Sequence, residues 1–124
     1  MALDLKTFKP ETAEEMWKAV LKEISADGKS WWEKTQDTLK DHLKALTVSV
    51  MRTRQDLKDG KLTRKEAAIV FRAAQTSFET VVPFTRYLTA VLAQRIINTV
   101  VSAVGWAVFN LTGFNFFPAF VDGG

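Results

Sequence analysis

The sequence predicts an all-α fold of three or four helices, with an antiparallel helical hairpin, an apolar C-terminal helix and an extended aromatic tail. Three observations support this prediction: three capping motifs, apolar residues at helical spacing after each of them, and a C-terminal half almost without charge. The length of 124 residues fits one domain. Within it, residues 1–82 are expected to form a charged amphipathic helical region, and residues 83–124 the apolar helix and tail.

The first helix is expected to begin at Thr12-Ala13-Glu14-Glu15. In this capping box, the side chains of Thr12 and Glu15 each satisfy a backbone donor at the helix start. The pair Asp27-Gly28 is expected to end the helix. One apolar stripe at helical spacing consists of Trp17, Val20, Leu21 and Ile24.

A second helix is expected to begin almost at once, at the capping box Ser30-Trp31-Trp32-Glu33. Its apolar residues form a heptad seam, which consists of Trp32, Leu39, Leu43, Leu46, Val50 and Leu57. Polar residues at Gln36 and Thr53 interrupt the seam, and it covers too few heptads to require a long coiled coil. We therefore expect an ordinary helix that packs on its neighbours.

The segment around Gly60 is expected to be a passive turn between two antiparallel helices. Asp59-Gly60 breaks the second helix, and Thr63-Arg64-Lys65-Glu66 is a third capping box. A connection this short places the two helices side by side. The segment fails as a calcium-binding EF-hand loop, because its first and third positions would be Gln55 and Leu57, which removes two carboxylate ligands.

The third helix is expected to stop near Pro83, which lacks a backbone donor and biases Val82 away from helical angles. Its apolar face consists of Ala67, Val70, Phe71, Ala74, Phe78 and Val81. Helical spacing then resumes at Phe84 and continues to Leu111. The many β-branched residues in 96–111 leave a strand or hairpin as the alternative there, and helix is the prediction.

Residues 96–121 carry no formal charge, and this run is the strongest signal in the chain. Its 26 residues exceed the roughly 20 that cross a bilayer as a helix. Asparagines, Gly113 and Pro118 interrupt it, so the uninterrupted part from Ile96 to Leu111 has the length of a buried core helix. A row of small residues at four-residue spacing, which lets two helix backbones approach closely, consists of Thr99, Ala103 and Ala107.

Five of the nine phenylalanines lie in the last 16 positions, in a segment that also contains glycine and proline. This tail must either fold back onto its own helices or expose an apolar patch of the kind that marks a partner or membrane surface. A partner is the preferred interpretation. The predicted partner interface comprises Thr99, Ala103, Ala107, Trp106, Phe109, Phe114, Phe116, Phe117 and Phe120.

The sequence offers no catalytic, cofactor-binding or metal-binding site. It has no cysteine, and its single histidine, His42, has no nucleophile motif to pair with. No glycine-rich phosphate loop occurs, and the carboxylates are mixed with lysine on solvated helix faces. We therefore expect neither an enzyme nor a cofactor. The lack of cysteine fits a reducing compartment or a virion.

Basic residues cluster around the hairpin turn, where they could contact the phosphate groups of nucleic acid or lipid. The possible phosphate contacts are Arg52, Arg54, Lys58, Lys61, Arg64 and Lys65. Asp56, Asp59 and Glu66 lie among them, no aromatic residue is interleaved, and no recognition motif accompanies them. A solvated helix end is the preferred interpretation.

The leading hypothesis is a non-enzymatic structural or assembly subunit of a homo-oligomer or larger protein complex, for example a virion, that associates through its apolar C-terminal half. Such a protein would be cytoplasmic or virion-associated. The alternative is a small membrane-inserted protein with its N-terminal helical domain on the cytoplasmic side of an inner membrane, because Arg86 and Arg95 precede the apolar run and only Asp122 follows it. A nucleic-acid-binding helical hairpin is the weaker alternative.

Overall fold

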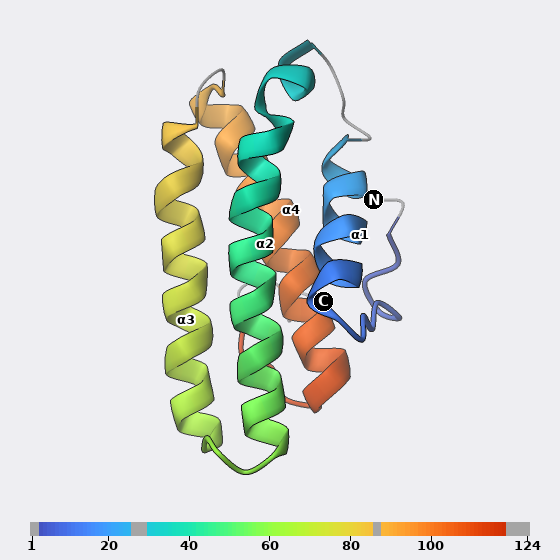
Figure 1. The fold of residues 1–124 in the computed structure, drawn as a ribbon, viewed down its shortest axis with the longest axis vertical. Coiled ribbons are helices and arrows are strands. Elements are labelled where there is room, and N and C mark those ends of the chain that lie inside the picture. Colours follow the sequence, from blue (N-terminus) through green and yellow to red (C-terminus); the bar gives the residue numbers. More distant parts are fainter. Residues whose placement is uncertain (1–2, 26–29, 86–87, 119–124) are drawn as a thin grey trace.

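The computed structural model describes residues 3–25, 30–85 and 88–118, without the side chains of 30–32 and 34. These residues form four α-helices, α1 (Ala13–Ser25), α2 (Ser30–Lys58), α3 (Arg64–Val81) and α4 (Ala90–Thr112), and one 3₁₀ turn, η1 (Val82–Phe84). Helix α2 lies between α1 and α3, and α4 runs behind it (Figure 1). No strand occurs in the described ranges, so the predicted all-α fold is confirmed.

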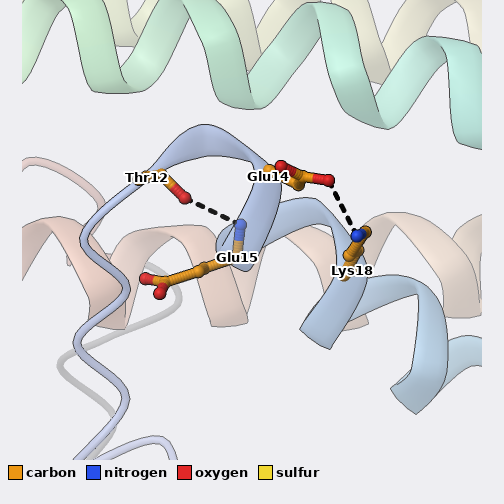
Figure 2. Close-up of polar contacts among 4 residues, drawn as sticks. All are labelled: Thr12, Glu14, Glu15 and Lys18. Carbon is orange, nitrogen blue, oxygen red and sulfur yellow. Dashed lines mark hydrogen bonds and ion pairs between the residues drawn. The ribbon is translucent and has the colours of Figure 1, made fainter.

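Helix α1 begins after Thr12, whose hydroxyl accepts a hydrogen bond from the backbone N–H of Glu15 at 3.1 Å (Figure 2). The other half of the predicted capping box is shifted by one residue, because the Glu15 carboxylate accepts from the N–H of Glu11 at 2.7 Å. On the first turn, Glu14 forms an ion pair of 2.7 Å with Lys18. The hydrogen bond from Lys18 and its charge hold the pKa of Glu14 below its ordinary value.

Helix α2 buries the predicted apolar seam through most of its length. Its buried members are Leu39, Leu43, Leu46 and Val50, and Leu57 is partly buried. The side chain of Trp32 lies outside the described residues. Thr53, which interrupts the seam in sequence, is also buried. Its hydroxyl donates a hydrogen bond to the carbonyl of Ser49 at 2.8 Å, so the polar group is satisfied inside the protein.

The turn between α2 and α3 ends α2 with a Schellman motif. The N–H of Gly60 donates to the carbonyl of Leu57, and the N–H of Lys61 donates to the carbonyl of Asp56. Gly60 has φ of 76°, a left-handed conformation that glycine adopts without steric cost. The predicted antiparallel hairpin is therefore present, with α2 and α3 side by side (Figure 1).

The start of α3 carries the complete predicted capping box. The hydroxyl of Thr63 accepts from the N–H of Glu66 at 3.1 Å, and the Glu66 carboxylate accepts from the N–H of Thr63 at 2.9 Å. The hydrogen bond from the N–H of Thr63 favours the ionised carboxylate, and together with the Thr63 side chain it holds the pKa of Glu66 below its ordinary value.

Helix α3 ends at Val81, near Pro83 as predicted, but the connection to α4 departs from the prediction in two ways. Val82 keeps helical angles, with φ −58° and ψ −45°, because its N–H donates to the carbonyl of Phe78 and its side chain is fully buried. This packing outweighs the steric bias from Pro83. Helix α4 starts at Ala90 and not at Phe84, because Thr89 provides the N-cap by accepting from the N–H of Leu92.

Helix α4 is the most buried helix of the protein, and the strand alternative for 96–111 is excluded. Its buried residues are Ala93, Ile96, Ile97, Val100, Val101, Ala103, Val104, Gly105, Ala107 and Val108. The helix packs against α1, α2 and α3. Gly113, with φ of 80°, ends it by donating its N–H to the carbonyl of Phe109 at 2.8 Å.

Asn110 attaches the N-terminal segment to the last turn of α4. Its side-chain amide donates to the carbonyls of Leu5 at 3.0 Å and Phe8 at 2.7 Å. Nearer the N-terminus, the N–H of Leu3 donates to the carboxylate of Glu23 on α1 at 3.1 Å. The asparagine that interrupts the apolar run in sequence is thus a structural tether in this fold.

Candidate functional site

The residues of the predicted partner interface are mostly turned into the protein. Ala103 and Ala107 are fully buried, and the small-residue row therefore brings α4 close to helices of its own chain. Thr99, Trp106, Phe109 and Phe116 are partly buried, Phe117 is buried and Phe114 is exposed. Phe120 lies outside the described residues. In this conformation a partner could contact Phe114 and the exposed parts of the partly buried residues, but not the buried alanines or Phe117.

The aromatic tail folds back onto α3, at least as far as Pro118, which is the last described residue. The ring of Phe117 packs against that of Phe71, with centroids 5.8 Å apart, and Phe116 contacts the same ring. The ring of Phe114 lies beneath the guanidinium of Arg64, with 4.1 Å between Cζ and the ring centroid. The sequence left open whether the tail folds back onto its own helices or exposes an apolar patch. The described tail residues fold back.

A different apolar surface is exposed at the connection between α3 and α4. Phe84 is 85% exposed, Val91 is 69% exposed and Val81 is 37% exposed. Sequence reasoning missed this surface, because it assigned Phe84 to the start of a helix whose apolar face would be covered. Pro83 was the available signal, since a proline after a helix commonly precedes an exposed turn.

A groove of about 290 Å³ runs between α2 and α3 and reaches Val81 at one end. Its walls are mostly apolar or small residues, namely His42, Ala45, Leu46, Ser49, Ala74, Ser77, Phe78 and Val81. The single histidine therefore lies at the edge of a surface groove. Among the described residues, no group of three or more His, Cys, Asp or Glu is placed to hold a metal ion.

The predicted phosphate-contact residues separate into two groups. Arg54 and Lys58 line a cleft of about 420 Å³ together with Lys9 from the N-terminal segment, and Arg64 reaches this region through its contact with Phe114. Arg52, Lys61 and Lys65 are exposed and do not line the cleft. Lys9 was missed from the sequence, since it is 45 positions away from Arg54 and no local pattern connects them.

Helix α4 is the one helix in the described part of the chain that is long and apolar enough to cross a membrane. By composition it is either a membrane span or a buried core helix, and in this structure most of its apolar stretch is covered by the other helices.

The fold and these surfaces define a helical-bundle protein with an apolar groove and a basic cleft. The chain matches no family model, no curated protein and no solved structure. Its function is therefore argued from these surfaces alone.

Proposed function

We propose that this chain is a non-enzymatic assembly subunit that binds a second copy of itself, and the exposure of Phe84 is the observation that supports it best. A phenylalanine ring that is 85% exposed gains about 1.5 to 3 kcal/mol when it is fully buried. The backbone at Phe84 is held in a short turn by Pro83 and by the hydrogen bond from the N–H of Thr85 to the carbonyl of Val82. Little backbone entropy is therefore lost when a partner covers the ring.

The groove between α2 and α3 supplies a complementary surface on the same molecule. Val81 closes one end of the groove and lies three positions before Phe84. In a two-fold symmetric dimer each copy contributes the same patch, so each Phe84 ring would meet the groove of the other copy.

The proposal moves the interface away from the apolar C-terminal half. Helix α4 provides the core of the subunit, and the α2–α3 face with Phe84 provides the contact.

The test is the sedimentation of the full-length chain over a wide concentration range. We expect a dimer that dissociates on dilution, and a monomer for Phe84→Ser and for Ser77→Trp, which fills the groove. The matched control is Ile69→Ser, because Ile69 is a comparably exposed apolar residue of α3 that does not line the groove. A wild-type monomer at every concentration, or dimers that survive both variants, would refute the proposal.

Membrane insertion through α4 is the second candidate, and the length and composition of this helix favour it. Insertion would have to withdraw α4 from the bundle and expose the residues that it covers, which is why self-association ranks first. Flotation with liposomes decides between the two. Carbonate-resistant flotation of the wild type, abolished by Val104→Lys, would favour insertion, because a lysine at the centre of a span opposes it by about 3 kcal/mol.

A further inference from the structure

We propose that the cleft between the last turns of α2 and α4 and the N-terminal segment binds an anionic amphiphile, a small molecule with a carboxylate or phosphate head and an apolar body. The cleft is independent of the proposed self-association. It lies near the start of α3, whereas Phe84 follows the end of that helix, about 27 Å away by helical rise.

The charge of the cleft comes from three cations that converge from different parts of the fold. Lys9 belongs to the N-terminal segment, and Arg54 and Lys58 are one turn apart on α2. Within the described ranges none of the three cations forms an ion pair with a carboxylate. Like charges placed together repel one another, and a bound anion relieves that repulsion.

The rest of the lining is mostly apolar. Leu57 comes from α2, and Leu111 and Phe114 come from the end of α4 and the segment after it. Phe114 is 40% exposed, and its ring is fixed by the guanidinium of Arg64 on one side. Its N–H donates to the hydroxyl of Thr112 at 3.1 Å, which fixes the backbone at this position. A volume of about 420 Å³ falls in the range of small-molecule sites, so head and body both have space.

Glu11 determines which end of the cleft receives the anionic head. A neighbouring hollow of about 410 Å³ shares Lys9, Arg54 and Leu111 with the cleft and adds Glu11 to its lining. This carboxylate repels an anion at that side. The head is therefore expected nearer to Lys58, which does not line the hollow with Glu11, than to Lys9, which does, and the apolar body is expected along Leu111 and Phe114.

The experiment is isothermal titration calorimetry of the full-length protein with decanoate below its micelle concentration, with decanol and with inorganic phosphate. We expect one decanoate to bind per chain. Decanol and phosphate should bind much more weakly, because decanol lacks the anionic head and phosphate lacks the apolar body. The double variant Arg54→Gln/Lys58→Gln should weaken decanoate binding roughly tenfold or more. Glu11→Gln should strengthen it.

Lys65→Gln is the matched control, because it removes a positive charge from the same hairpin outside the cleft. If Lys65→Gln weakened decanoate binding as much as the double variant does, the overall positive charge of the hairpin would explain the binding, and the proposed site would be overturned. So would the absence of decanoate binding, equally tight binding of decanol or phosphate, or binding to anionic vesicles without any binding of free decanoate. Circular dichroism melting of each variant verifies that it remains folded.

Discussion

The ring of Phe116 lies against the ring of Phe71, with centroids 4.9 Å apart and ring planes inclined by 54°. This contact joins the segment after α4 to the middle of α3. Phe117 contacts the same ring and is only 3% exposed. The described part of the aromatic tail is therefore a component of the hydrophobic core.

We first predict that the tail stabilises the single subunit. Phe117→Ala should lower the free energy of unfolding by about 3 to 5 kcal/mol, because it leaves a cavity in the core. Phe114→Ala, at a 40% exposed position, should lower it much less. Urea denaturation of the two variants measures the difference. Equal losses would show that Phe117 is not packed in the core.

The second prediction concerns the tether at Asn110. Asn110→Ala should cost about 1 to 3 kcal/mol of stability, because it leaves the carbonyls of Leu5 and Phe8 without their donor. Asn98→Ala is the matched control, since Asn98 is exposed and its side chain accepts a hydrogen bond from Gln94 on its own helix. Thermal melts that shift equally for both variants would argue against the tether.

The third prediction is a pH dependence of the capping box on α3. The pKa of Glu66 is lowered from 4.5 in the folded protein by its hydrogen bonds with Thr63. Its contribution to stability is therefore complete above pH 4.5 and is lost as the pH falls through the folded pKa. Glu66→Gln does not titrate, so the difference in melting temperature between wild type and variant should change only below pH 4.5. A constant difference across that range would contradict the assignment.

The fourth prediction separates backbone strain from steric crowding at Gly60. A Cβ atom at this position would meet no atom within 4 Å. A substitution there therefore destabilises the protein only because a residue with a side chain disfavours the left-handed backbone conformation. Gly60→Ala should destabilise the protein by about 1 to 2 kcal/mol. Gly60→Asn should cost less, because asparagine tolerates positive φ better. The order of the two melting temperatures checks this, and a more stable alanine variant would count against it.

The elements that the sequence predicted correctly depend on residues close together in the chain. The capping box of Thr63 and Glu66 spans three positions, and the stretch 96–111 that was predicted to be helical is continuous and lies within α4. In the first capping box the Glu15 carboxylate accepts from the N–H of Glu11, and not from the adjacent N–H of Thr12 as predicted. The local sequence pattern does not distinguish between these two donors.

The features that the sequence left undetermined depend on tertiary contacts. Val82 keeps helical angles because it is buried, which no local rule about Pro83 reveals. The direction of the tail depends on Phe71, more than 40 positions earlier in the chain. The basic cleft likewise requires Lys9 and Arg54 to meet, and only the completed bundle brings them together.

The long sequence separation of the Asn110 hydrogen bonds also leads us to expect an order in which the parts of the molecule form. They join residues 105 and 102 positions apart, whereas the α2–α3 hairpin closes through neighbours in the chain. Closing so long a loop carries a larger entropic cost, so the N-terminal segment should dock after the helices have assembled. By the same reasoning it should detach first in native-state hydrogen exchange. Lys9 moves with this segment, so the basic cleft would be the last surface to be completed during folding and the first to be lost.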